Sequence, residues 1–156
     1  METKPLSAAY SALLDDAVSL VFGTSSDGGW NAGQVLAHIV ISDRTFASVC
    51  TELLIGLNPS YDNRASQAAP YLDAVARAAG TWQALLENVR RGGEELTDLI
   101  AQFSAAQAEQ PLVASGVMGE QEVVLEMTAA EFAGNLATLH LPSHHQQLLA
   151  LAAVSA

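Results

Sequence analysis

The sequence predicts an all-α protein: a four-helix bundle with a short β-hairpin between the third and fourth helices. Two observations carry this prediction. Apolar residues recur at three- and four-residue intervals in four long stretches, which is typical of helices that bury one face. Residues 111–127, by contrast, are rich in β-favouring side chains on both sides of a Gly-Glu turn. At 156 residues the chain is expected to fold as one domain, residues 1–156, without a disulfide.

The first helix is expected over residues 6–22, where apolar side chains follow the helical spacing. Residues 23–29 end it, because glycine, serine and aspartate favour turns. The second helix has a stronger start signal. Asn31 is a favourable N-cap, and Gln34 three residues later can complete a capping box. Its helical pattern is expected to end at Gly56.

Residues 60–69 are polar and are expected to be a loop, which at this length can form one wall of a pocket. A long helical pattern follows over residues 70–108, and the pair at positions 92–93, two glycines, is expected to kink or split it. The hairpin is expected over residues 111–127, with its turn at positions 119–120.

The last helix begins with another predicted capping box, formed by Thr128 and Glu131, and runs toward Val154. One face of this helix is expected to point into the core, and it carries Phe132, Leu136, His140, His144, Leu148 and Leu151. Two imidazoles therefore interrupt a face that is otherwise apolar.

A spacing of four residues stacks His140 and His144 on one face of a helix. Two imidazoles are too few ligands for a stable metal site, so a third must come from elsewhere. His145 points away, about 100° around the helix from His144, whereas His38 lies on another helix. We therefore predict a metal site made by His38, His140 and His144, with open positions for water or substrate. The alternative is that each ring is neutral and hydrogen-bonded within the core.

A proline, Pro142, lies between the two histidines of the last helix. Proline removes one helical hydrogen bond and clashes with the preceding turn, here near Thr138, at a cost of about 3 kcal/mol. We therefore expect a bend in the helix, which would rotate His144 relative to His140.

Other polar or reactive residues near this pattern are weaker candidates. Cys50 lies off the face that carries His38 and is expected to be a buried small apolar side chain. Asp43 and Arg44 could orient a ligand, but an exposed ion pair is the simpler interpretation. Trp30 is interpreted as packing at the helix start, with no role at the metal.

The formal net charge is −11, no Lys or Arg follows Arg91, and eight acidic residues lie over positions 94–131. Nucleic acid is disfavoured as a partner, because phosphate binding relies on clustered cations. Anionic membrane surfaces are disfavoured for the same reason. A strongly anionic substrate is also disfavoured, unless a metal or Arg44 offsets the negative potential.

Targeting signals are not evident in the sequence. No window approaches the roughly 18 uninterrupted apolar residues of a membrane span. The N-terminal residues lack the pattern of a signal peptide. A single cysteine agrees with a reducing compartment. A cytoplasmic location is therefore expected.

Residues 30–44 carry a Trp ahead of Val-Leu-Ala-His-Ile, with Asp-Arg following. This stretch resembles the second-helix motif of the DinB-like superfamily, and more narrowly the N-terminal domain of mycothiol-dependent maleylpyruvate isomerases. The late His-x-x-x-His and the hairpin before the last helix also fit. The resemblance implies that His38, His140 and His144 bind a divalent ion, most often zinc or nickel.

The resemblance also implies an activity: a thiol S-transferase or isomerase that uses a low-molecular-weight thiol such as mycothiol and a small electrophile. A metal ion would lower the pKa of the thiol, so that a strong nucleophile exists at neutral pH. The alternative is a non-catalytic DinB-like module that binds a metal or a ligand. A third interpretation is a structural helical domain that pairs through residues 148–154, and a homodimer is compatible with all three.

Overall fold

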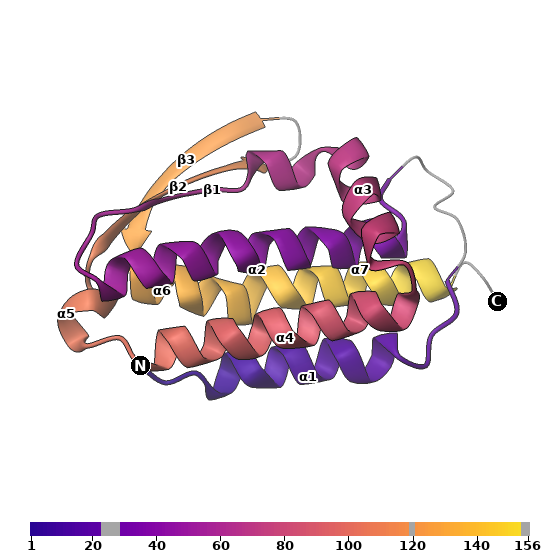
Figure 1. The fold of residues 1–156 in the computed structure, drawn as a ribbon, viewed down its shortest axis with the longest axis horizontal. Coiled ribbons are helices and arrows are strands. Elements are labelled where there is room, and N and C mark those ends of the chain that lie inside the picture. Colours follow the sequence, from indigo (N-terminus) through magenta and orange to yellow (C-terminus); the bar gives the residue numbers. More distant parts are fainter. Residues whose placement is uncertain (23–28, 119–120, 154–156) are drawn as a thin grey trace.

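The computed structural model describes residues 1–22, 29–118 and 121–153, and it forms the expected helical bundle (Figure 1). Within these residues, α1 and α2 each pack against both α4 and α7, so the bundle core lies among four helical runs. The four runs are α1 (Lys4–Ala17), α2 (Ala32–Leu54), α4 (Trp82–Ala101) and the continuous segment α6 (Ala129–Asn135), η2 (Leu136–His140) and α7 (Leu141–Ala153).

The first helix, α1, ends at Ala17, five residues before the predicted end at Phe22. Two of the apolar residues after it, Val18 and Val21, are 56% and 79% exposed, whereas Phe22 packs against Trp82. With these two valines outside the core, the apolar spacing of this segment is not enough to keep it helical. The predicted turn at residues 23–29 lies almost wholly outside the described residues.

Helix α2 begins as predicted. The Asn31 side chain accepts a hydrogen bond from the Gln34 backbone amide, and the Gln34 side chain accepts one from the Asn31 amide, both at 2.9 Å. The helix ends at Leu54, and Gly56 follows with φ of 82°, a backbone conformation that favours glycine.

The predicted loop over residues 60–69 contains regular structure instead. Ser60–Asp62 forms a short strand, β1, and Arg64–Gln67 forms a 3₁₀ turn, η1. β1 runs parallel to β2 of the hairpin, with Tyr61 opposite Ala114. A three-residue strand is too short to give an alternating pattern, and its partner lies about fifty residues away, so local sequence gave no signal for it.

The predicted helix over residues 70–108 is divided, but not at the two glycines. It breaks at Gly80, which has φ of 80°, between α3 (Ala69–Ala79) and α4. A short helix, α5 (Ala105–Ala108), follows separately. Gly92 and Gly93 lie inside the unbroken α4, and both are buried. Their lack of a side chain allows close packing rather than a kink.

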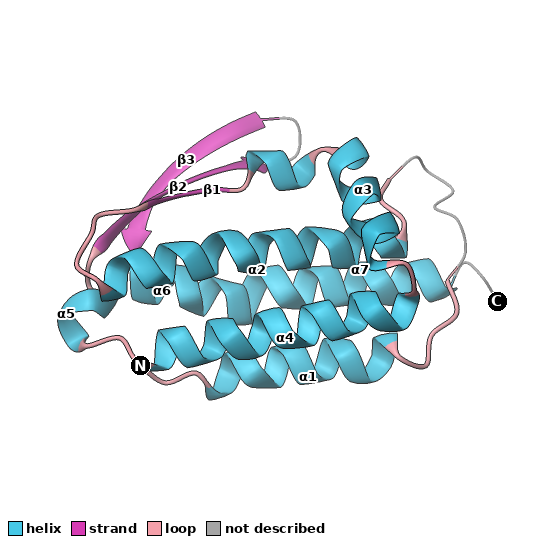
Figure 2. Ribbon diagram, viewed as in Figure 1, coloured by secondary structure: helices cyan, strands magenta, loops and turns pink. Residues whose placement is uncertain are grey.

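The hairpin is formed as predicted by β2 (Pro111–Met118) and β3 (Gln121–Thr128), and the predicted turn residues 119–120 lie outside the described residues. The strands are antiparallel, and with β1 they make a sheet in the order β1-β2-β3. Figure 2 shows this sheet in magenta along one side of the bundle, above α2 and α6. The three-stranded sheet thus covers one flank of the bundle.

The last helical run starts with the predicted capping box of Thr128 and Glu131. Its core-facing residues are also as predicted: Phe132, Leu136 and Leu148 are buried, and Leu151 packs against the core. Leu148 itself belongs to the chain's own core, so it is not part of a surface that could pair with a second copy.

Asp43 is buried, which corrects the expectation of an exposed ion pair with Arg44. The Tyr10 hydroxyl donates a hydrogen bond of 2.6 Å to Asp43 Oδ1, whereas Arg44 pairs with Glu95 at the surface. Cys50 is fully buried, as expected.

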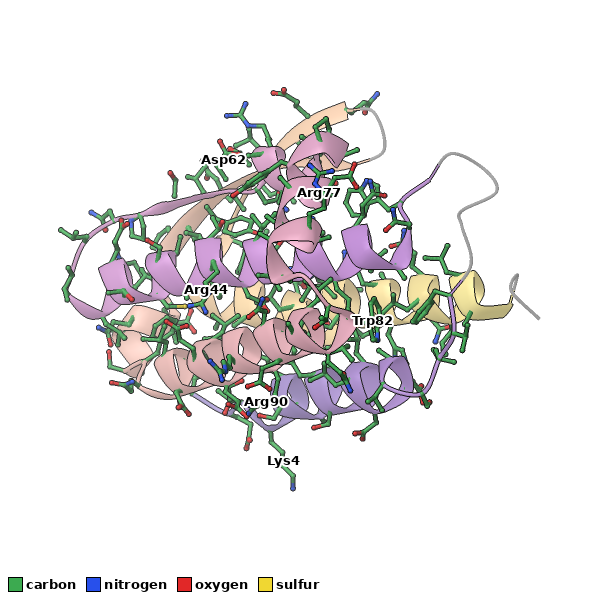
Figure 3. All side chains as sticks on the ribbon, turned by 45° about the vertical axis from the view of Figure 1, so that its right-hand side comes forward. Lys4, Arg44, Asp62, Arg77, Trp82 and Arg90 are labelled. Atoms are coloured by element: carbon green, nitrogen blue, oxygen red, sulfur yellow. The ribbon has the colours of Figure 1, made fainter. Side chains whose placement is uncertain are left out.

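Figure 3 shows Lys4 extending away from the bundle. Within the described residues, no helix combines the length and apolar character of a membrane span.

Candidate metal centre

His38, His140 and His144 lie together, although His38 is about a hundred residues from the other two along the chain. One ring nitrogen from each lies within 4.8 Å of one nitrogen of each of the others. The Nε2 atoms of His38 and His140 are 3.1 Å apart. His38 lies in the second turn of α2, His140 is the last residue of η2, and His144 is the fourth residue of α7. Packing of α2 against the last helical run therefore brings the three rings together.

Two of the rings are oriented by hydrogen bonds on their outer side. His38 Nδ1 donates to the carbonyl oxygen of Ser66 at 2.9 Å, and His144 Nδ1 donates to Gln147 Oε1 at 3.1 Å. A neutral imidazole carries one N–H, so both rings present a bare Nε2 lone pair on the other side. Outer hydrogen bonds of this kind fix the tautomer and orientation of metal-binding histidines.

Burial keeps the cluster neutral. It lowers the pKa of His38 from 6.5 to about 4 and that of His140 to about 3, with nearby His144 lowering both further. Burial also lowers the pKa of His144, and the hydrogen bond that its Nδ1 donates to Gln147 opposes this. Neutral imidazole is the form that coordinates a metal ion, since the proton and the metal compete for the same lone pair.

The residues present fit a divalent ion. Three neutral imidazoles with converging nitrogens are a donor set that suits zinc or nickel, with further positions left open. The alternative, in which each ring is satisfied within the core, is met only in part. His140 Nε2 could donate a hydrogen bond to His38 Nε2, 3.1 Å away, but His140 Nδ1 is buried without a hydrogen-bond partner among the described residues.

Pro142 does not separate the two histidines as expected. The residues just before it, Leu136–His140, form a wider π-helical turn in which the Leu141 amide donates to the Leu136 carbonyl. The turn takes up the break in the hydrogen-bond ladder, and the helix continues to Ala153. The His140 and His144 rings remain in contact, with centroids 4.6 Å apart.

Trp30 is a residue of the site that sequence reasoning missed. Its ring centroid lies 4.9 Å from that of His38 and 6.2 Å from that of His144. The available signal was its position just before the N-cap of the helix that carries His38, but it was interpreted only as packing at the helix start.

The weaker candidates lie away from the cluster. His145 donates from Nε2 to Asp16 Oδ2 at 2.8 Å, on the side of the last helix that faces α1. Arg44 is at the surface. Burial raises the pKa of the Cys50 thiol to about 12, which makes it a poor metal ligand.

A cavity of about 710 Å³ opens beside the three histidines. The hairpin and the last helical run form most of its walls. Tyr61, Asn63 and Gln67 also line it, so the segment of residues 60–69 does form one wall of a pocket, as the sequence indicated. A small molecule in this cavity would meet the three imidazoles directly.

Fold and site together define a class: a helical bundle with a three-histidine cluster at a cavity beside a small sheet. The chain belongs to the DinB superfamily, whose sequence profile matches residues 7–148. Among solved structures it is similar to one described as "YfiT from Bacillus subtilis is a probable metal-dependent hydrolase with an unusual four-helix bundle topology". That similarity has a TM-score of 0.64 at 18% identity and covers 97% of this chain and 87% of the other. No curated protein sequence matches significantly.

Proposed function

We propose that this protein is a divalent-metal enzyme in which His38, His140 and His144 hold a zinc or nickel ion. In the proposed reaction, a low-molecular-weight thiol such as mycothiol attacks a small electrophile, as in S-transfer or isomerisation. The observation that carries the proposal is the convergence of three neutral imidazole nitrogens beside an open cavity. Such a site binds a metal and leaves room for reactants.

The chemistry that the ion supplies is a lowered pKa for a bound thiol or water, together with polarisation of an electrophile. The chain's own residues hold the site in shape. Ser66 and Gln147 orient two of the rings, and Trp30 covers them on one side. Among the described residues that line the cavity there is no Asp or Glu to act as a general base. The protein therefore relies on the lowered pKa of the nucleophile itself.

A second candidate is hydrolysis, in which water replaces the thiol. The likeness to YfiT, a probable metal-dependent hydrolase, favours it. Both candidates need the same three histidines and differ only in the nucleophile. The non-catalytic alternative, a module that binds a metal or ligand without turnover, shares the same site.

The partners that we propose are a small thiol and a small electrophile, and not nucleic acid or a membrane. We also propose that the protein is a homodimer in the cytoplasm. The exclusion of nucleic acid and anionic membranes is supported by four arginines that each pair with a carboxylate at the surface: Arg44, Arg64, Arg90 and Arg91. Paired cations give no basic patch for a phosphate backbone. The homodimer is tested by the molecular mass in solution.

Metal content tests the site. Protein purified without a His tag should carry about one zinc or nickel ion per chain by elemental analysis, and His140→Ala should lose it. His145→Ala is the matched control, because it removes a neighbouring imidazole that faces Asp16. Equal loss in both variants, or no metal in the wild type after incubation with zinc and nickel, would overturn the proposal.

Turnover then separates the candidates. Metal-loaded protein is incubated with a generic electrophile and a series of thiols, and separately with neutral esters. Product that needs a thiol supports the transferase, whereas ester cleavage without thiol supports the hydrolase. Bound metal with neither reaction contradicts both and leaves the binding module.

A further inference from the structure

The cavity beside the histidines is lined without charged side chains. None of the described residues that form its walls is Lys, Arg, Asp or Glu. Its larger apolar contributors are Trp30, Val123, Leu125, Met127, Phe132 and Leu136. The polar side chains among them, besides the histidines, are neutral amides and hydroxyls such as Asn63, Asn135 and Ser143. The walls can therefore bury apolar surface and offer hydrogen bonds, but no counter-charge.

The charged side chains around Arg64 lie outside the cavity, and two carboxylates there share one guanidinium. Arg64 pairs with Asp62 at 2.7 Å and with Glu122 on β3 at 3.1 Å, and all three side chains are exposed. The guanidinium of Arg64, which lies in η1, is therefore already engaged outside the cavity. With a net charge of −11, the protein as a whole also repels anions.

The cavity meets solvent through apolar side chains. Leu125 and Leu139 both line it and are 47% and 61% exposed, so they lie where the cavity opens. Exposed leucines at the opening of a cavity favour the entry of apolar molecules, since their contact with water is unfavourable. The opening and the walls of the cavity thus both favour apolar molecules.

We infer that the cavity takes a neutral, largely apolar substrate: an uncharged electrophile whose reacting group faces the histidines. This inference deepens the proposed function and rests on it for the direction in which the substrate points. A charged group on the body of the substrate would be buried without a partner, which is strongly unfavourable. Only the group that reaches the three histidines could carry a negative charge, if a metal is bound there.

Two fluorescent probes with one skeleton test the inference. N-Phenyl-1-naphthylamine is neutral, and 8-anilinonaphthalene-1-sulfonate differs from it by one sulfonate. Binding is titrated to chelator-treated full-length protein, so that the sulfonate finds no metal ion. The neutral probe should bind about tenfold more tightly or better, because the sulfonate would be buried unpaired. Equal or tighter binding of the sulfonate would overturn the inference.

A pair of neighbouring valines supplies matched variants. Val123 lines the cavity, whereas Val124 is 67% exposed and does not line it. Val123→Lys should shift the preference toward the sulfonate by about tenfold, because it adds a cation to the wall. Val124→Lys should leave the preference unchanged. A shift in preference toward the sulfonate cannot come from unfolding alone. An equal shift in both variants would show that the probes bind outside the cavity, which would contradict the inference.

Metal binding, measured on the same preparations, separates this inference from the proposed function. A preference for the neutral probe in protein that takes up no metal would support the cavity's selectivity and contradict the metal enzyme. Stoichiometric metal binding with no preference for the neutral probe would support the metal site and contradict the inferred selectivity of the cavity.

Discussion

Gly93 lies directly against the ring of Tyr10: a β-carbon at position 93 would stand 2.8 Å from the ring's Cγ and Cδ1 atoms. The ring cannot easily move away, because its hydroxyl donates a buried hydrogen bond of 2.6 Å to Asp43. This contact lets α1 and α4 approach closely. It explains why a glycine occurs in the middle of a helix, where glycine is otherwise unfavourable.

Gly93→Ala should therefore destabilise the protein by about 1–3 kcal/mol, the usual cost of overpacking a core. Gly134→Ala is the control, because nothing lies within 4 Å of the added carbon in α6. It should stabilise by up to about 1 kcal/mol through helix propensity. Urea unfolding measures both, and a neutral Gly93→Ala would contradict the packing described.

The elements that the sequence predicted well are those with local signals. The capping boxes at Asn31 and Thr128 act within three residues, and both are formed. The predictions that were wrong depended on distant contacts. Gly93 was interpreted as a kink because its partner, Tyr10, lies on another helix, and β1 was missed because its partner strand comes much later in the chain.

The same division applies to the site. The grouping of His38, His140 and His144 was predictable because two of them share a helical face and only one other histidine lay outside that helix. The partner of His38, the Ser66 carbonyl, was not predictable, since any backbone carbonyl can accept and only the fold selects one. Pro142 was expected to disturb the site, but a π-helical turn is a rare adjustment that no local rule announces.

The contact between Gln147 and His144 gives a second prediction. Gln147→Leu removes the acceptor that orients the ring and should weaken zinc binding about tenfold or more. Gln147→Glu keeps an acceptor and should retain affinity. Gln146→Leu, on the exposed side of the same helix, is the control and should bind as the wild type. Competition with a chelating dye measures the dissociation constants, and an unchanged value for Gln147→Leu would argue against an orienting role.

Asp43 gives a prediction for pH. Burial raises the pKa of this carboxyl from 3.8 to about 7, and the hydrogen bond from Tyr10 opposes the rise. Between these values the folded chain holds a proton that the unfolded chain has lost. Unfolding then releases a proton, so this group's contribution to stability is full below about pH 4 and falls as pH rises to about 7.

Asp43→Asn cannot titrate, yet its carbonyl oxygen can still accept from Tyr10. Relative to the wild type, the variant should gain stability as pH rises from about 4 to about 7, by on the order of 4 kcal/mol. The buried histidines have the opposite pH dependence, but they are common to both proteins and cancel in the difference. Denaturant unfolding at several pH values measures it, and a constant difference would contradict a raised pKa.

Metal should also stabilise the fold, because the three histidines converge only in the folded chain. Free zinc at about 1,000 times the dissociation constant should add about 4 kcal/mol to the free energy of unfolding, and EDTA should remove that gain. His140→Ala should show no response to either reagent. Thermal unfolding with and without zinc measures this, and an equal response in the variant would mean that the ion binds elsewhere.

The short strand β1 has a consequence beyond the sheet that it extends. Asn63, the residue after it, donates its amide to the Ser115 carbonyl on β2 and accepts from the Ser66 amide, and the Ser66 carbonyl in turn holds His38. The position of the cavity wall and the orientation of the His38 ring are therefore coupled through these hydrogen bonds. A molecule that shifts the hairpin would also turn His38, so occupancy of the cavity and affinity for metal are expected to influence each other reciprocally.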